Sequence, residues 1–150
     1  MFDFSLIVPT LKVKGISKEK YAMKLSEYFE QIKGKGVLAT ADSSGRVNSA
    51  VYARPHVIDE ETIAFIMAER LSHENLQSNP SACYVLMEDG DKFVGKRLYL
   101  TKTKEEKNTE LIEQLRRKRH YIAHEEYYKE NKYLVYFHID KVLPLIGSGT

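Results

Sequence analysis

The apolar run at positions 62–67, TIAFIM, limits the possible fold more than any other segment of this sequence. It has the length of one β-strand, and it lacks the alternation of apolar and polar residues that marks a strand with one face in water. A strand of this kind is covered on both of its faces. The segment therefore predicts a buried strand inside one hydrophobic core.

Short runs of β-forming residues, separated by turn residues, surround this strand. GVLATA at 36–41 and the residues at 47–53 flank the cluster Asp-Ser-Ser-Gly, a pattern typical of a β-hairpin. Further runs of the same kind follow, with Asp, Gly and Pro residues between them. The sequence predicts six strands, at residues 36–41, 47–53, 62–67, 82–87, 95–103 and 133–139.

Helical spacing of apolar residues predicts helices in three other places. Ser17 is suited to cap an amphipathic helix that continues to Gly34, and Ser72 is suited to cap a short helical turn over residues 73–78. The stretch 104–132, rich in Glu, Lys and Arg, predicts one or two surface helices. Strands joined by hairpins, with a few added helices, favour a small antiparallel barrel of the α+β class.

The overall composition excludes several classes of protein. At 150 residues we expect a single domain over 1–150. The 23 Lys and Arg residues against 21 acidic residues leave a net charge of +2, which gives no general attraction to nucleic acid or membranes. The sequence lacks a run of 18 apolar residues and a basic signal-peptide start, and it has one cysteine, Cys83. We therefore expect a cytoplasmic protein without nucleic acid or membrane among its partners.

The loop after the buried strand has the chemistry of a phosphate site. Arg70, Ser72 and His73 lie close together at the start of the predicted helical turn. A guanidinium, a hydroxyl and the free N–H groups of a helix N-terminus are groups that bind a phosphate. The alternative is that Arg70 is solvated, Ser72 is only a cap and His73 lies on the surface.

The order of these segments resembles a known family. The hairpin GVLATADSSGRVNSAVYA, the strand TIAFIM and the stretch NLQSNPSACYVLM follow one another as in the pyridoxamine 5'-phosphate oxidase-like family of FMN-binding split barrels. The resemblance covers residues 36–103. It implies a six-stranded antiparallel split β-barrel with peripheral helices, which binds FMN as a homodimer.

The resemblance also implies which residues contact the flavin. The strand at 47–53 would lie along the ring, and the end of the strand at 62–67, with the loop after it, would meet the ribityl phosphate. The candidates are Asn48, Ser49, Ala50, Val51 and Tyr52 on the ring side, and Ile66, Met67, Arg70, Leu71, Ser72 and His73 on the phosphate side. Family members often have an Arg-Lys pair where this chain has Leu71 and Ser72, so Arg70 and His73 would supply the charge.

A second basic pair, Lys96 and Arg97, stands at the start of a predicted strand. Because the family holds its cofactor at the dimer interface, these side chains could reach the other subunit's flavin, where a cation stabilises the reduced ring. The alternative is a solvated strand edge on which lysine opposes aggregation.

The other histidines and the basic run at 116–120 give weaker signals. His120 and His124 have i, i+4 spacing, but they lack an HExxH motif and follow a run of cations, so no metal site is expected. We expect nearby acidic residues to balance the run RRKRH on a solvated helix face, and His138 to be structural.

The predicted function is that of an FMN-binding flavoprotein, an oxidoreductase acting on an unknown small substrate, in which the flavin carries the redox chemistry. The chain has no recognisable version of the C-terminal motif that completes the vitamin site in pyridoxamine oxidases, so vitamin B6 synthesis is not expected. Two alternatives stay open: a non-enzymatic FMN electron carrier and a haem-binding split-barrel module.

Overall fold

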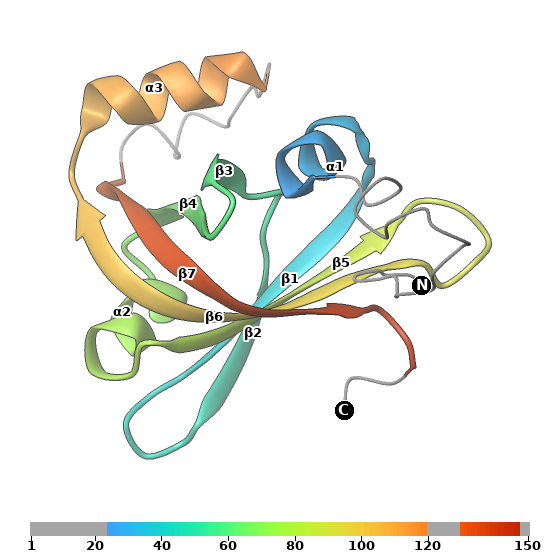
Figure 1. Cartoon of the computed structure of the whole chain (residues 1–150). Helices are drawn as coiled ribbons and strands as arrows, with labels where there is room; N and C mark the ends of the chain where they lie inside the picture. Colours follow the sequence, from blue (N-terminus) through green and yellow to red (C-terminus); the bar gives the residue numbers. More distant parts are fainter. Residues whose placement is uncertain (1–23, 120–129, 148–150) are drawn as a thin grey trace.

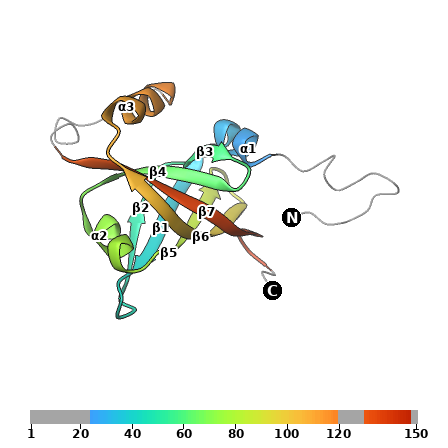
Figure 2. The same cartoon turned by 60° about the vertical axis from the view of Figure 1, so that its left-hand side comes forward.

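The computed structural model describes residues 24–119 and 130–147. Its main feature is one seven-stranded sheet in which neighbouring strands are antiparallel, curled as Figures 1 and 2 show. The strands are β1 (Gly34–Ala41), β2 (Val47–Val51), β3 (His56–Asp59), β4 (Thr62–Ala68), β5 (Ser81–Glu88), β6 (Gly95–Glu106) and β7 (Lys132–Pro144). They lie side by side in the order β2, β1, β5, β6, β7, β4, β3.

The predicted hairpin is confirmed as β1 and β2. Its turn is closed by the carboxylate of Asp42, which accepts hydrogen bonds from the backbone N–H groups of Ser44 and Arg46 at 2.9 Å each. Gly45 has φ of +89°, a conformation that a residue without a side chain adopts at little cost. The turn therefore sets the register in which Thr40 lies opposite Asn48.

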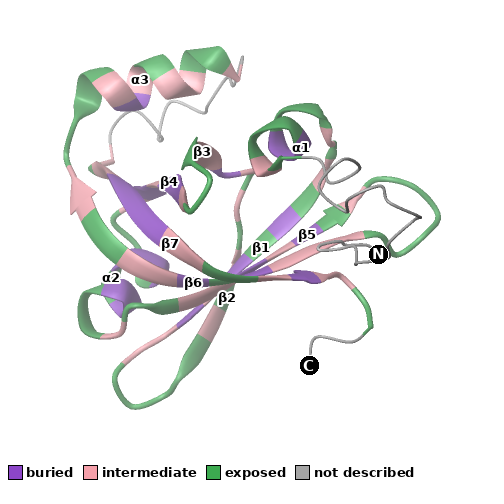
Figure 3. Cartoon of the chain, viewed as in Figure 1, coloured by how far each residue is buried: buried purple, intermediate pink, exposed green. Residues whose placement is uncertain are grey.

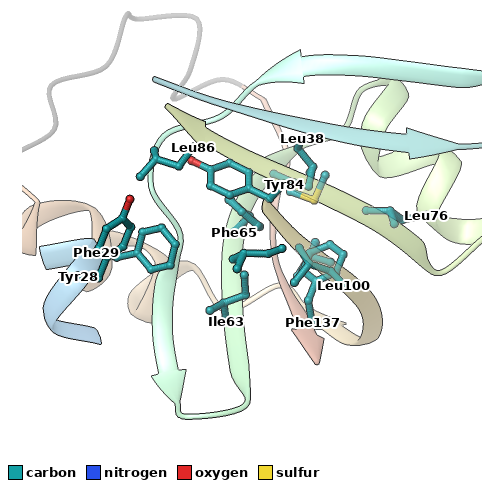
Figure 4. Close-up of a cluster of buried hydrophobic side chains, with 13 residues drawn as sticks. Tyr28, Phe29, Leu38, Ile63, Phe65, Leu76, Tyr84, Leu86, Leu100 and Phe137 are labelled. Carbon is teal, nitrogen blue, oxygen red and sulfur yellow. The ribbon is translucent and has the colours of Figure 1, made fainter. Parts of the chain in front are cut away.

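β4 is the predicted buried strand, and one of its faces points into the main core. Ile63 and Met67 are fully buried and Phe65 is 2% exposed. The Phe65 ring lies 5.0 Å from the ring of Tyr84 and 5.9 Å from that of Phe137, measured between centroids (Figure 4). This face of β4 therefore joins residues from β5 and β7 in one apolar cluster.

The other face of β4 is covered by a helix, α3 (Thr109–Lys118). Ala64 is fully buried in a second cluster with Ile112 of α3, and Ile66 packs against the same cluster. The absence of polar residues after Thr62 in β4 thus has a direct cause, since protein covers both faces of the strand.

The α+β class and the antiparallel sheet are confirmed, but the sheet has seven strands and not six. The additional strand is β3, which follows Pro55 directly. β3 has four residues, pairs with β4 alone and contains a register shift between Val57 and Asp59. β3 forms because it pairs with β4, so its own sequence gives little indication of a strand.

The helices differ from prediction at their ends. α1 is described as Leu25–Gln31, and the predicted start at Ser17 lies outside the described residues. α2 (Leu71–Ser78) begins earlier than predicted, with Arg70 and not Ser72 at the N-cap position. β6 continues to Glu106, in a segment predicted as helix, because residues 104–106 pair with residues 134–136 of β7. Pairing with a neighbouring strand overrides helix propensity there.

The helices lie in two places around the sheet. α2 packs against β1 and β2, whereas α1 and α3 lie near β3 and β7 (Figures 1 and 2). Figure 3 shows that α2 has buried residues on its inner side, while much of the β1–β2 hairpin is exposed. None of the helices described in 24–119 and 130–147 is long and apolar enough to cross a membrane.

A close approach of β1 and β5 fixes the backbone just after β2. A Cβ atom on Gly36 would lie 1.9 Å from the hydroxyl oxygen of Tyr84, so only glycine leaves room for this ring. The Tyr84 hydroxyl donates a hydrogen bond to the carbonyl of Tyr52 at 3.1 Å, and the Tyr52 N–H donates to the carbonyl of Gly36 at 3.0 Å. Tyr52 is therefore held where β2 ends.

Candidate functional site

The first turn of α2 contacts the start of β2. Ser72 is 3% exposed, and its hydroxyl accepts a hydrogen bond from the side-chain amide of Asn48 at 3.3 Å. One turn further along α2, the buried Asn75 donates to the Thr40 hydroxyl of β1 at 3.0 Å. These bonds join α2 to the hairpin, and they explain why an asparagine at position 75 suits the stretch NLQSNP.

The N-terminus of α2 has the features of an anion-binding end. Arg70, the N-cap residue, makes no side-chain capping hydrogen bond. The first N–H groups of a helix have no partner within the helix, and they carry its positive dipole end. These N–H groups and the Ser72 hydroxyl are thus donors that suit a phosphate.

Arg70 already holds an acidic partner. Its guanidinium forms a two-pronged pair with Glu130: Nε donates to one carboxylate oxygen at 2.9 Å, and Nη2 donates to the other. The Arg70 side chain is 70% exposed, so the pair lies at the surface. The charge of Arg70 lowers the pKa of Glu130 through this hydrogen bond. A phosphate that used Arg70 would have to compete with Glu130.

Tyr52 belongs to the same group of residues. Burial raises the pKa of Tyr52, while hydrogen bonding with Ser72 and the positive charge of Arg70 act in the opposite direction. The structure therefore brings Asn48 and Tyr52 of the predicted ring side together with Arg70 and Ser72 of the predicted phosphate side.

The other predicted residues of β2 and β4 divide between two faces. Asn48 and Ala50 are half-buried, whereas Ser49 and Val51 are exposed on the opposite face of β2. Met67 is fully buried in the core, Ile66 is half-buried, and Leu71 is 52% exposed. Met67 can therefore support the site only through its backbone or its packing.

His73 is buried within an interior polar network. Its ring is stacked on that of Tyr133, with centroids 4.2 Å apart, and Nε2 lies 2.9 Å from a carboxylate oxygen of Glu105. Gln77 and Lys102 donate hydrogen bonds to the same carboxylate, at 2.9 and 2.6 Å. The His73 side chain is thus engaged by Glu105, and its backbone N–H is the part that faces the N-terminus of α2.

Lys96 and Arg97 lie apart from these residues within one protomer. Lys96 Nζ is 4.7 Å from the centroid of the Tyr28 ring, and Arg97 donates to the carbonyls of Pro144 and Gly147 at 2.9 and 3.3 Å. Along β5 and β6, Leu86 faces Lys96 and Ser81 faces Thr101, so this pair is several residues from the α2 end of the sheet. A role for them at the other subunit's flavin stays a prediction.

A cavity of about 300 Å³ lies beyond the end of β2, between β4 and α3. Val51, Tyr52 and Ile66 of the predicted set line it. The sequence analysis missed its cationic wall, which Arg54, Arg116 and Arg119 form. The run at 116–119 was expected on a solvated face, yet the side chains of Arg116 and Arg119 are 13% and 12% exposed. Their spacing of four and seven residues from the buried Ile112 was the available signal.

The remaining candidates of the sequence analysis are placed in part. His138 is half-exposed, and its ring nitrogens contact Asp140 at 2.8 Å and Glu61 at 3.3 Å, which raises its pKa. His120 and His124 lie outside the described residues. Within 24–119 and 130–147, no group of three His, Cys, Asp or Glu residues is arranged to hold a metal ion.

The curled antiparallel sheet with peripheral helices has the same fold as split barrels of the pyridoxamine 5'-phosphate oxidase-like type. Solved structures share this fold. An FMN-binding protein from Syntrophomonas wolfei subsp. wolfei has a TM-score of 0.69 at 19% identity, over 83% of this chain and 86% of that one.

Two further structures show the range of proteins with this fold. A candidate pyridoxamine 5'-phosphate oxidase from Lactobacillus delbrueckii has a TM-score of 0.57 at 16% identity, covering 89% of this chain and 97% of that one. HutZ, the haem storage protein of Vibrio cholerae, has a TM-score of 0.54 at 19% identity, covering 77% and 89%. No protein-family model and no curated protein matches the chain significantly. At these identities the likeness establishes the fold.

The Glu105 network makes stability depend on pH. Burial acts to raise the pKa of Glu105, but hydrogen bonds from Gln77, Lys102 and His73 outweigh it and lower the pKa from 4.5 to about 2. Because the pKa of Glu105 is lower in the folded state than in the unfolded state, its ionised form stabilises the fold at pH values above about 4.5. This stabilisation is lost as the pH falls from about 4.5 to 2. We expect Glu105→Gln to lower the stability at pH 7 and to flatten its acid dependence, measured by urea unfolding at pH 7, 4 and 3. Parallel pH profiles for variant and parent would refute this role of Glu105.

Proposed function

We propose that this chain is an FMN-binding flavoprotein, an oxidoreductase acting on a small substrate. The observation that carries the proposal is the contact between Asn48 and Ser72, at 3.3 Å. It joins the strand proposed to lie along the ring to the helix terminus proposed to hold the phosphate. The fold shared with an FMN-binding protein supports the same conclusion.

The residues divide between the two halves of the cofactor. The N–H groups of the first turn of α2, the Ser72 hydroxyl and Arg70 are proposed to hold the phosphate, since they offer neutral and charged donors to one anion. Asn48, Ala50 and Tyr52 are proposed to face the ring, with Ser49, Val51 and Ile66 at its border. Bound FMN would supply the redox chemistry, so the chain's own groups bind and orient it and tune its potential.

The proposal includes a homodimer in the cytoplasm, with residues 1–150 as one FMN-binding domain and no nucleic acid or membrane partner. Val47 and Val51 on the outer face of β2 are 77% and 82% exposed. Apolar side chains this exposed on one edge strand favour cover by a second copy. In that assembly Lys96 and Arg97 are proposed to approach the partner's flavin.

The flavin proposal is tested by the chromophore and by two substitutions with opposite effects. The purified protein is expected to be yellow and to release FMN on heating. Arg70→Ala is expected to weaken FMN binding by about 1–3 kcal/mol, because a charge-assisted hydrogen bond to phosphate is lost. Glu130→Gln is expected to strengthen binding by about 2- to 10-fold, because it removes a competing carboxylate from Arg70. Fluorescence titration of FMN measures both.

Arg117→Ala is the matched control, since Arg117 is an exposed arginine on α3. It should leave the FMN affinity unchanged. A colourless protein that does not take up FMN would exclude both the oxidoreductase and the electron carrier. A Soret band on addition of haemin, with no FMN binding, would instead favour a haem-binding module. HutZ, which shares the fold, is a haem storage protein.

The dimer is tested with a charge on the exposed face of β2. We expect Val47→Asp to shift a dimer toward monomer in size-exclusion chromatography with light scattering, because burying an unpaired carboxylate at an interface is costly. Ile58→Asp places the same charge at a residue that is 46% exposed on β3, and it should leave the dimer intact. A parent protein that is monomeric at every concentration, or equal effects of the two variants, contradicts the proposed interface.

Turnover separates an oxidoreductase from a passive carrier. We expect NADH or NADPH to bleach the flavin absorbance of the loaded protein rapidly under nitrogen, and air to restore it. The rate is measured by stopped-flow absorbance at saturating FMN. Reduction no faster than that of free FMN at the same concentration would assign the chain to the electron carriers.

A further inference from the structure

The cavity beyond β2 has an apolar wall and a cationic wall. Its lining includes the apolar residue Ile66 of β4 and the aromatic residues Tyr52 and Phe65, together with three arginines, Arg54, Arg116 and Arg119. Its volume of about 300 Å³ has room for about ten non-hydrogen atoms, taking ~30 Å³ for each water-sized group. The shape and the two kinds of wall suit a small ligand with one apolar end and one polar end.

Arg119 lines this cavity, and its guanidinium is held mainly by backbone carbonyls. Its Nη1 and Nη2 donate to the carbonyls of Arg54 and Pro55 at 3.2 and 2.8 Å. Its Nε, alone among the buried side-chain nitrogens and oxygens in the described parts of the chain, has no hydrogen-bond partner. Leaving a buried charged donor unsatisfied is costly.

The acidic residues near the cavity leave an excess of positive charge. Glu113 pairs with Arg116, and Glu30, which is half-exposed, approaches Arg119 to 3.8 Å. Arg54 Nη1 donates to the carbonyls of Phe29 and Ile32, so backbone groups hold it. Within residues 24–119 and 130–147, the ion pairs of these three arginines thus involve two carboxylates.

His56, which also lines the cavity, responds to this charge. Burial, followed by the positive charges of Arg119, Lys118 and Arg54, lowers the pKa of His56 to about 4. The ring is therefore neutral at pH 7 and can donate or accept one hydrogen bond. An anion bound among the arginines would raise this pKa again, which makes His56 a reporter of occupancy.

We propose that this cavity binds a small organic acid, with its carboxylate or phosphate facing the guanidinium groups of Arg54, Arg116 and Arg119, and its apolar body against Ile66. Val51 and Tyr52 belong both to the cavity and to the proposed ring side of the flavin site. If the proposed function holds, on which this step rests, the acid is the substrate and lies beside the ring.

The test uses the FMN-loaded protein and three probes of one shape. Benzoate and phenyl phosphate carry the two kinds of anion, and benzamide is the neutral analogue of benzoate. We expect calorimetric titration to show at least tenfold tighter binding of one or both anions than of benzamide, and the tighter anion identifies the head group. In the NMR spectrum, the pKa of His56 should rise when that anion is bound.

Two substitutions on α3 localise the effect. Arg116→Gln is expected to weaken anion binding at least fivefold, while Lys118→Gln, which removes an equal charge from a residue that does not line the cavity, should change it less than twofold. Equal binding of benzamide and benzoate, no binding of either anion, or equal effects of the two variants overturns the proposal. So does displacement of the anion by FMN, because the cavity would then belong to the ring.

The same measurements separate this proposal from the flavin proposal. Benzoate binding that depends on Arg116 in a protein that takes up no FMN upholds the acid site and refutes the flavoprotein. FMN binding that is intact in Arg116→Gln, with anion binding lost, supports both.

Discussion

The burial of β4 on both faces is the constraint on which the rest of the structure depends. A strand with six apolar residues in a row cannot leave either face in water, because each exposed aliphatic side chain forfeits about 1.5–3 kcal/mol of burial. One face of β4 is buried inside the curled sheet, where Phe65 packs against Tyr84 and Phe137. The other requires α3, whose Ile112 closes over Ala64. The fold therefore places a helix where its arginines can reach the cavity.

The functional candidates are held by backbone groups as much as by one another. Arg54 binds the last carbonyls of α1, and Arg119 binds the carbonyls of Arg54 and Pro55. The two guanidinium groups thus connect α1, the segment after β2 and the end of α3. Charged groups whose positions are set in this way need little reorganisation when an anion arrives, which is the condition for strong electrostatic binding in a small cavity.

How far the sequence predicts this molecule depends on whether a signal is local. The hairpin, the buried strand and the position of α2 follow from turn chemistry and apolar runs, and they were predicted. β3 and the last residues of β6 were missed, because their order comes from pairing with β4 and β7 and not from their own composition. The same holds for Arg70, whose pairing with Glu130 joins residues 60 positions apart.

The arginines at the end of α3 show most clearly where prediction from the sequence stops. A run of four cations is normally a solvated face, and only its phase relative to Ile112 indicates that two of the four turn inward. That phase could have been read from the sequence. The sequence does not indicate which residues form the rest of the cavity, because Tyr52 and Phe65 come from distant parts of the chain.

The spacing along β2 finally relates the two proposed anion sites. Asn48, beside Ser72, is near the start of the strand, and Arg54 follows its end by three residues. At about 3.3 Å per residue, these positions lie about 20 Å apart along an extended chain. Tyr52 lies between the two positions, because it lines the cavity and hydrogen-bonds with Ser72. The proposed phosphate site at the start of β2 and the proposed acid site beyond its end are thus connected through Tyr52, which is a residue of both.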